Sequence, residues 1–294
     1  MSRIRQIGAF VEVVRQGGFS AAAQTLFTTQ SAVSKSVKLL EEELGFLLIE
    51  RLGHRSALTQ AGEVVYRHGV KMLATQDDME SELRDLAGLK DGTLRLGLSP
   101  VGSDILYAPL FTIYRKRYPG VKVSLVETGS DSLKDLVRDG QLDFAGTLLP
   151  VSDEFDYHMV RKEPLVCVLP AKHRLANAGA LSLKELKDEP FILFETGFAL
   201  HRIMMEASRK RNFEPKVIAQ STQIDFMIQL VGAGLGVAFL PRMIAAQRET
   251  KAVKSVLLNE PGTQWRMAMT WRRGGYLSAA AKAWLNLVKE IHTT

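Results

Sequence analysis

The first 45 residues predict three short helices joined by tight turns. Apolar residues at helical spacing run from Ile4 to Val14 and stop at a pair of glycines. Ser20 is placed to cap a second, short helix, and Thr28 or Thr29 is placed to cap a third helix that ends at Gly45. Two helices, a short turn and another helix predict a helix-turn-helix motif.

The third helix has one apolar face and one polar face. Val33, Val37 and Leu40 recur at helical spacing and are expected to face a core. The outward positions carry hydrogen-bond donors and cations, namely Gln30, Ser31, Ser34, Lys35 and Lys38. Such side chains contact base edges and phosphates when the N-terminal half of a helix enters the major groove of DNA. We therefore assign Gln30, Ser31 and Ser34 to base edges and both lysines to phosphates, against the alternative of a solvated polar face.

A β-hairpin is expected directly after this helix. Residues 49–51 and 56–58 have strand character on either side of a turn at Gly53-His54. The hairpin adds a wing to the motif, and its Arg51 and Arg55 are placed to reach flanking phosphates or the minor groove.

A long helix, capped by Thr59 and extending over 60–88, separates this motif from the rest of the chain. Its apolar side chains repeat every seven residues, at Val65, Met72, Met79 and Leu86. A seven-residue repeat between two domains predicts a dimerisation seam. The alternative is that the stripe packs on its own domain, and Gly69, Thr75 and Gln76 interrupt it. Residues 87–92 form a glycine-punctuated hinge.

Strands alternate with helices beyond the hinge. Strands are expected at 93–98, 121–126, 144–149, 165–169 and 191–194, and helices include 105–118 and 132–139. This alternation implies parallel sheets with ligands at the C-terminal ends of the strands. We expect two subdomains, I over about 92–162 and 266–294 and II over about 163–265, because the final strand and helix return to the first half.

Residues 19–45 closely resemble the DNA-binding signature of the LysR-type transcriptional regulators, from Phe19-Ser20-Ala21-Ala22-Ala23 to Glu43-Leu44-Gly45. The segments Leu47-Leu48-Ile49-Glu50-Arg51 and Leu58-Thr59-Gln60-Ala61-Gly62 agree as well, so the resemblance is specific over roughly residues 3–65. It implies an α+β chain of two parts. A winged helix-turn-helix over 1–59 and a dimerisation linker helix over 60–88 precede an α/β effector-binding domain over 92–294, with the periplasmic-binding-protein-like fold of two subdomains.

The resemblance implies a bacterial regulator that binds an interrupted inverted repeat in double-stranded DNA near promoters. The chain would act as a homodimer or homotetramer (a dimer of dimers), with RNA polymerase as a further candidate partner. Ser20 and Thr29 complete the DNA-binding set. Family members often carry Pro where this chain has Ser31 and Arg where it has Lys35, so the helix start is less fixed and the phosphate contact less bidentate here.

Members of the family bind a small co-effector in the cleft between the two subdomains. The positions expected to line that cleft follow strand ends or border a glycine-rich turn: Ser99, Pro100, Val101, Gly102, Thr128, Gly129, Thr147, Phe194, Thr196, Thr222, Val237 and Phe239. A hydroxyl at a strand end is also a common helix cap, so each Ser or Thr has that alternative; Thr222 in particular is placed to cap a helix with Asp225 three residues on. The glycines at 232–236 follow a helix instead of opening one, which argues against phosphate binding.

Charge gives weaker guidance. The net charge is +6, and residues 1–60 hold seven basic and five acidic side chains, so only 7 − 5 = +2 lies in the DNA-binding region. The surplus in the effector domain favours an anionic effector, such as an organic or aromatic acid.

Several other functions are disfavoured. The six histidines are scattered, Cys167 is the single cysteine, and we find no catalytic motif, so we expect no enzyme, metal or cofactor. Cys167 lies between valines and is interpreted as a buried apolar residue, with a redox sensor as the alternative. A single cysteine and the absence of an export signal or a membrane-length apolar run lead us to expect a cytoplasmic protein without membrane contact. The rival classes, a solute-binding protein and an enzyme with a DNA-binding appendage, would need that export signal or a catalytic cluster.

Overall fold

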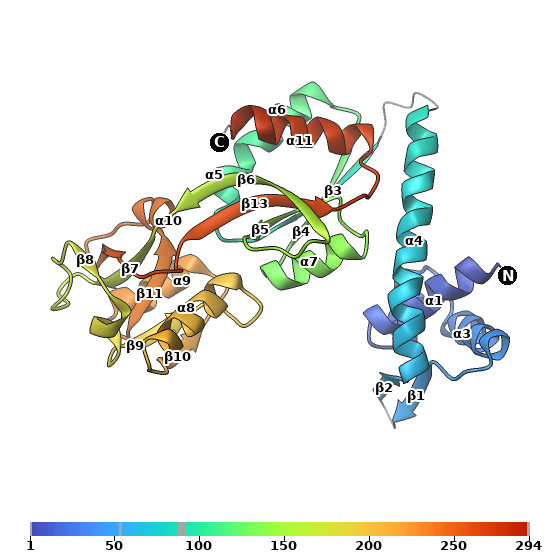
Figure 1. The fold of residues 1–294 in the computed structure, drawn as a ribbon, viewed down its shortest axis with the longest axis horizontal. Helices are drawn as coiled ribbons and strands as arrows, with labels where there is room; N and C mark the ends of the chain where they lie inside the picture. The colour runs from blue at the N-terminus through green and yellow to red at the C-terminus, as the bar shows by residue number, and fades with distance from the viewer. Residues whose placement is uncertain (1, 53–54, 87–91, 293–294) are drawn as a thin grey trace. The chain divides into compact units, whose positions relative to one another are not determined.

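The computed structural model describes residues 2–52, 55–86 and 92–292, and the chain divides into a smaller N-terminal unit and a larger C-terminal unit (Figure 1). The turn at Gly53-His54 and most of the predicted hinge lie outside the described residues. Within these ranges no helix is both long enough and apolar enough to cross a membrane.

The N-terminal unit contains the expected helices and hairpin. Its elements are α1 (Arg3–Arg15), α2 (Phe19–Thr25), α3 (Gln30–Leu44), β1 (Ile49–Leu52), β2 (Arg55–Leu58) and α4 (Gln60–Leu86). Val33, Val37 and Leu40 of α3 are buried with Phe10 of α1, as the periodicity predicted. The small side chains of Ala22 and Ala23 are buried too, so that α2 lies close to its neighbours.

Two of the expected helix caps are confirmed. Thr29 precedes α3 and its hydroxyl accepts a hydrogen bond from the amide of Ala32 at 3.2 Å. Thr59 does the same for α4, accepting from the amide of Gly62 at 2.9 Å. Gly45 ends α3 with a φ of 74°, a left-handed conformation that glycine adopts without strain. The cap predicted at Ser20 is wrong: α2 begins at Phe19, its N-cap is Gly18, and Ser20 lies inside the helix.

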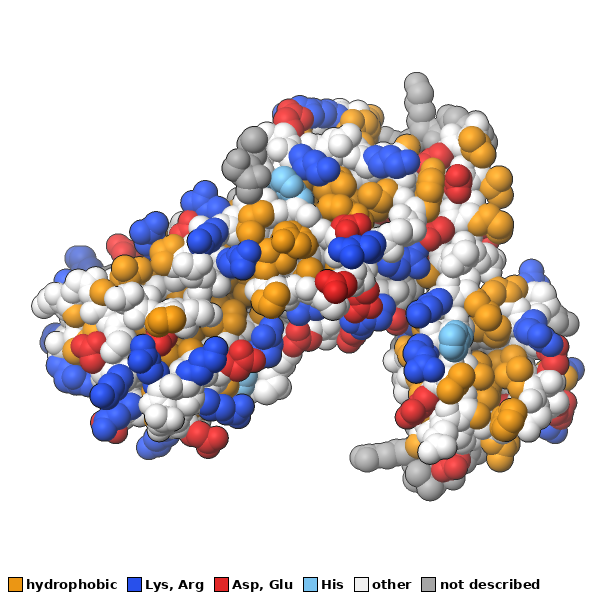
Figure 2. Space-filling model, viewed as in Figure 1, with side chains coloured by type: hydrophobic (Ala, Val, Ile, Leu, Met, Phe, Trp, Pro, Cys, Tyr) orange, Lys and Arg blue, Asp and Glu red, His pale blue; other side chains and the backbone are white. Residues whose placement is uncertain are grey.

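The apolar repeat of α4 divides between two environments. Val65 packs against the core of the N-terminal unit, whereas Met72, Met79 and Leu86 are more than half exposed. Hydrophobic side chains are visible along the C-terminal half of this helix (Figure 2). Gly69 does not merely interrupt the repeat, because a Cβ there would lie 2.8 Å from Cγ2 of Ile7 on α1. Glycine therefore allows α1 to approach α4 closely.

The C-terminal unit consists of two lobes, each built on one sheet (Figure 1). Lobe I has the strand order β4-β3-β5-β13-β6, formed by Lys122–Glu127, Thr93–Leu98, Phe144–Leu148, Trp265–Arg272 and Phe155–Glu163. Lobe II has the order β10-β9-β11-β7-β12-β8, formed by Lys216–Gln220, Pro190–Leu193, Val237–Pro241, Leu165–Pro170, Val253–Leu258 and Ala180–Leu181. The chain crosses between the lobes after β6 and again before β13.

The expectation of parallel sheets is wrong for part of each lobe. β3 is parallel to β4 and β5, but β13 lies antiparallel between β5 and β6. In lobe II, β7 is antiparallel to both β11 and β12. The reason is the double crossover, since β13 re-enters lobe I from the opposite direction. Strands β6, β8, β10 and β12 were also missed in the sequence.

The helices of the C-terminal unit begin near strand ends. Lobe I carries α5 (Ser103–Leu106), α6 (Ala108–Arg117), α7 (Ser130–Arg138) and α11 (Ala279–Ile291), and lobe II carries the 3₁₀ helix η1 (Leu183–Leu186), α8 (Ala199–Lys210), α9 (Ile224–Gly232) and α10 (Arg242–Ala246). The single helix predicted over 105–118 is broken at Tyr107. The cap predicted at Thr222 is also wrong, because Gln223 is the N-cap of α9 and the hydroxyl of Ser221 accepts from the Gln223 amide at 3.0 Å.

Candidate functional site

The polar face of α3 is free to contact another molecule. Gln30, Ser31, Lys35 and Lys38 are exposed and Ser34 is half-buried, while the opposite face is buried in the core. The hydroxyls of Thr29 and Ser31 lie 3.0 Å apart at the start of the helix. Thr29 thus fixes the end of α3 that presents these side chains.

Charge is unevenly distributed along α3. Its N-terminal half has no carboxylate, whereas its C-terminal end has Glu41, Glu42 and Glu43. The Glu42 carboxylate lies 3.6 Å from Nζ of Lys38, and Arg3 pairs with Glu43. The hydrogen bond from Arg3 holds the pKa of Glu43 below its ordinary value. An anionic polymer is therefore favoured at the N-terminal half of α3 and repelled from its C-terminal end.

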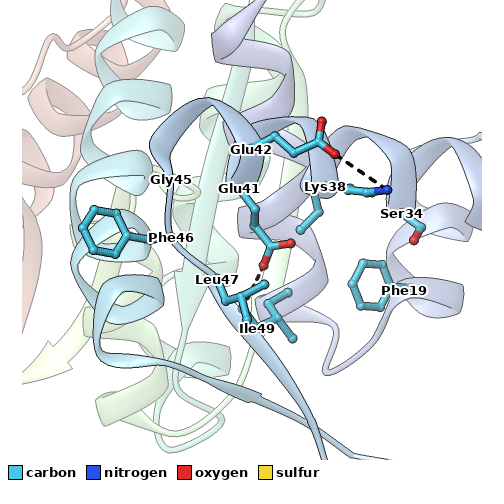
Figure 3. A pocket seen from close by; sticks show the side chains of 10 residues that line it. Phe19, Ser34, Lys38, Glu41, Glu42, Gly45, Phe46, Leu47 and Ile49 are labelled. Atoms are coloured by element: carbon cyan, nitrogen blue, oxygen red, sulfur yellow. Dashed lines mark hydrogen bonds and ion pairs between the residues drawn. The ribbon is translucent and has the colours of Figure 1, made fainter.

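Glu41 has a structural role beside this face. Its Oε1 accepts hydrogen bonds from the amides of Leu48 at 2.8 Å and Ile49 at 3.3 Å, so it ties α3 to the wing. Figure 3 shows Glu41 and Ile49 at a pocket of about 500 Å³ that Ser34, Lys38, Phe46 and Leu47 also line. Phe46 and Leu47 are about two-thirds exposed.

The turn between α2 and α3 contains an unusual residue that the sequence reasoning missed. Phe27 has a φ of 51° and its side chain is 97% exposed. The Thr28 amide donates to the carbonyl of Ala23 at 2.9 Å, a bond that closes the end of α2. The sequence shows only that Phe27 directly precedes the cap candidates Thr28 and Thr29. Its left-handed backbone, a conformation that favours glycine, is apparent from the structure.

Of the other residues predicted to contact DNA, the structure describes the side chain of Ser20 only. Ser20 is exposed on α2. The β1–β2 hairpin pairs Ile49 with Leu58 as expected, but the side chains of Arg51 and Arg55 lie outside the described part of the structure.

The residues predicted to contact an effector come from both lobes. Ser99 to Gly102 follow β3, Thr128 and Gly129 follow β4, and Thr147 is in β5. Phe194 and Thr196 follow β9 on the other lobe, and Thr222 precedes α9. Ser99 is only 4% exposed, and its Oγ accepts from the amide of Val101 at 3.5 Å. Thr196 is exposed.

The hydroxyl of Thr147 is already engaged within lobe I. It lies 3.2 Å from Oγ1 of Thr270, which donates to the carbonyl of Ala145 at 3.0 Å. Since Thr270 uses its proton for Ala145, Thr147 donates to Thr270 and can offer a ligand only an oxygen acceptor.

Two glycines bring the lobes into contact. A Cβ on Gly129 would lie 2.6 Å from the carbonyl oxygen of Gly197 and 3.4 Å from the ring of Phe198. The amide of Asp131 also donates to that carbonyl, at 3.4 Å. Phe198 stacks on Phe194 with ring centroids 5.6 Å apart. The lobes are therefore closed on each other beside an aromatic pair.

Most of the predicted cleft residues are buried, and Val237, Phe239 and Gly102 are packed against aromatic side chains or within a strand of the core. Val237 and Phe239 of β11 are buried, and the Phe239 ring lies 4.9 Å from that of Phe191. A Cβ on Gly102 would lie 3.0 Å from the indole of Trp265. Cys167 is also buried, and burial raises the pKa of its thiol, which favours the unreactive thiol form.

Comparison with known proteins assigns both units. Residues 4–63 match the bacterial regulatory helix-turn-helix family of LysR type, and residues 87–292 match the LysR substrate binding domain. The chain is 38% identical over 287 residues to the HTH-type transcriptional regulator YwbI of Bacillus subtilis, covering 97% of this chain and 95% of the relative. It is 30% identical over 289 residues to the RuBisCO operon transcriptional regulator of Allochromatium vinosum, with the same coverage.

Solved structures share the fold. A full-length OxyR variant from Pseudomonas aeruginosa has a TM-score of 0.71 at 22% identity, with coverage of 98% of this chain and 95% of that one. Full-length BenM has a TM-score of 0.59 at 24% identity, with coverage of 99% and 96%.

A winged helix-turn-helix with an exposed polar third helix, followed by a two-lobed substrate-binding domain, defines a DNA-binding transcriptional regulator. The chain belongs to the LysR family of transcriptional regulators, whose members are not enzymes.

Proposed function

We propose that this regulator binds an interrupted inverted repeat near promoters and responds to an organic or aromatic acid held between its two lobes. The observation that carries the DNA part is the face of α3, where Gln30, Ser31, Ser34, Lys35 and Lys38 lie away from the core behind a capped helix start. That arrangement suits base contacts from the first turn and phosphate contacts farther along.

The proposed assembly is a homodimer or a dimer of dimers. It is supported by the exposed apolar side chains of α4, which are Met72, Met79, Leu83 and Leu86. Apolar side chains repeated along one helix are stabilised by pairing with the same helix of a second copy. Two paired copies would present two α3 helices, which is why the proposed DNA site is an inverted repeat.

The proposed effector class rests on the cleft and on charge. The stacked rings of Phe194 and Phe198 stand beside the Gly129–Gly197 contact and are buried, so they would meet an aromatic or apolar body only when the lobes separate. Residues 61–294 carry a surplus of 6 − 2 = +4 charges, which favours an anion. A ligand there changes the regulator only as far as its affinity differs between arrangements of the lobes.

The DNA assignment is tested by fluorescence anisotropy on the upstream intergenic DNA at several salt concentrations. Ser34→Ala should lower the preference over scrambled DNA by about 1 kcal/mol, as loss of one hydrogen bond does. Lys38→Ala should weaken binding to both DNAs and reduce the salt slope by about 1, because one phosphate contact is lost.

Lys116→Ala on α6 is the matched control, since it removes the same charge from an exposed site in the C-terminal unit. An equal change of slope in both lysine variants would show that bulk charge, and not the position of Lys38, sets the affinity.

A further inference from the structure

One guanidinium connects three elements at a flank of the lobe interface. Arg248, which follows α10 in lobe II, donates from Nε to Asp225 of α9 at 3.0 Å. It also donates from Nη2 to Asp104 of α5 at 3.2 Å. The bond to Asp225 stays within lobe II, whereas the bond to Asp104 joins lobe II to lobe I.

Both partners of the inter-lobe bond are held in place by their own lobes. Arg248 is only 20% exposed, and its Nη1 donates to the carbonyl of Ile244 at 3.4 Å. Asp104 accepts from the amide of Ile105 at 2.9 Å through its other oxygen. Since the side chains are already ordered, little conformational entropy is lost when they pair, and the bond contributes more than a mobile surface ion pair does.

The position of this bond relates it to the cleft. Asp104 comes two residues after Gly102, at the end of the Ser99–Gly102 segment, and Asp225 comes three residues after Thr222. Any rotation that separates α5 from α10 must break the bond from Arg248 to Asp104. The ion pair between Arg242 and Glu163, at 3.8 Å, lies instead where the chain crosses from β6 to β7. That pair can persist through such a rotation.

We propose that the Asp104–Arg248 ion pair is a latch that holds the two lobes in the closed arrangement seen here, before any ligand binds. The latch sets the ratio of closed to open molecules in the free protein, and an effector would change this ratio when it binds. It rests on the proposed function only for what the cleft binds, because closure itself is a property of the free protein. Salt weakens the latch, since Asp104 is 52% exposed and its charge is screened.

The test measures the separation of the lobes by double electron–electron resonance in the full-length chain. Spin labels are attached at Lys116→Cys in lobe I and Lys184→Cys in lobe II, both exposed. Cys167 is buried and its thiol stays protonated, so it does not take up label. The labelled protein is mixed with excess unlabelled protein, so that distances between labels on different copies do not contribute to the signal.

Asp104→Asn should lower the ratio of closed to open molecules by about two- to five-fold at low salt, the range expected for a partly exposed ion pair. Raising NaCl to about 1 M should shift the parent chain in the same direction and leave Asp104→Asn nearly unchanged. Asp225→Asn is the matched control, because it removes a carboxylate from the same guanidinium without touching the lobe interface.

The latch is ruled out if Asp104→Asn has the parent distance distribution, or if Asp225→Asn shifts it equally. The salt titration of the parent chain tests the latch independently, without any substitution at the ion pair. No DNA or effector is added, so failure here leaves the proposed function standing, and loss of DNA binding would leave the latch standing.

Discussion

At the scale of single residues, the backbone of Phe27 stores strain at the turn before α3. A left-handed conformation costs a residue with a Cβ about 1–2 kcal/mol, and glycine avoids most of this. Because the Phe27 side chain is 97% exposed, little packing is lost with it. Phe27→Gly should therefore raise the free energy of unfolding by about 0.5–1 kcal/mol, after the greater freedom of glycine in the unfolded chain is allowed for. Urea denaturation measures this change.

Phe27→Ala is the control for that substitution, since it removes the ring and keeps the Cβ, and its stability should stay close to that of the parent. If Phe27→Gly is less stable than the parent, the ring makes contacts that outweigh the strain. A loss of DNA affinity in both variants would show that the strained ring is kept for DNA binding.

The helix caps show what a sequence pattern can specify at this scale. Thr28 or Thr29, and Thr59, were predicted as caps because each stands immediately before an amphipathic stretch. The hydroxyls of Thr29 and Thr59 accept the expected amides. Ser20 and Thr222 stand before equally clear stretches, yet Gly18 and Gln223 occupy the N-cap positions. Neighbouring residues compete for one cap, so the pattern locates a helix start only to within one or two residues.

At the scale of elements, α4 carries the proposed dimer contact. Replacing Met72 and Met79 together by Glu should weaken the dimer at least about tenfold, because two half-exposed methionines are lost per copy and carboxylates are brought together. Sedimentation velocity over a concentration series measures the dissociation constant. Ser81→Glu adds a carboxylate on the other side of the helix and should leave the dimer intact; an unchanged mass for the double variant would assign the stripe to another role.

Strand order was harder to predict than helix position. Strand β3 was predicted with its observed bounds because it is apolar and flanked by turn signals. Strand β10 has an exposed-to-intermediate alternation over Lys216–Gln220 with no fully buried residue, so it lacks the apolar signal of a central strand. The place of β13 between β5 and β6 depends on pairings with Ala145 and Tyr157, which are more than a hundred residues away. Local periodicity contains no information on such pairings.

At the scale of the whole molecule, the two sites differ in how far sequence could specify them. The α3 face follows from a periodicity within fifteen residues, so its outward residues could be named in advance. The Asp104–Arg248 bond joins residues of different lobes that are 144 positions apart in the sequence. The contact of Gly129 with Gly197 also joins the two lobes, and no local sequence pattern predicts either contact. The proposed DNA-contacting face is thus a property of one element, and the contact between the lobes is a property of the fold.

The thermal stability of the two units should depend on pH in different ways. Each has its own apolar core, so we expect two thermal transitions in calorimetry. His292 belongs to the C-terminal unit, and its Nε2 lies 3.3 Å from the carbonyl oxygen of Leu106. The carbonyl oxygen of His292 lies 3.0 Å from Nε2 of His158. Burial holds the pKa of His292 below the ordinary value of 6.5.

As the pH falls below about 6.5, the unfolded chain therefore binds a proton at His292 that the native protein resists. The C-terminal unit should lose stability in that range, and its transition should move to lower temperature between about pH 7 and about pH 5.5. His292→Gln should make this shift smaller. Duplex DNA at low salt identifies the other transition by raising the melting temperature of the N-terminal unit. An equal pH shift in the parent and in His292→Gln would mean that other groups control acid stability.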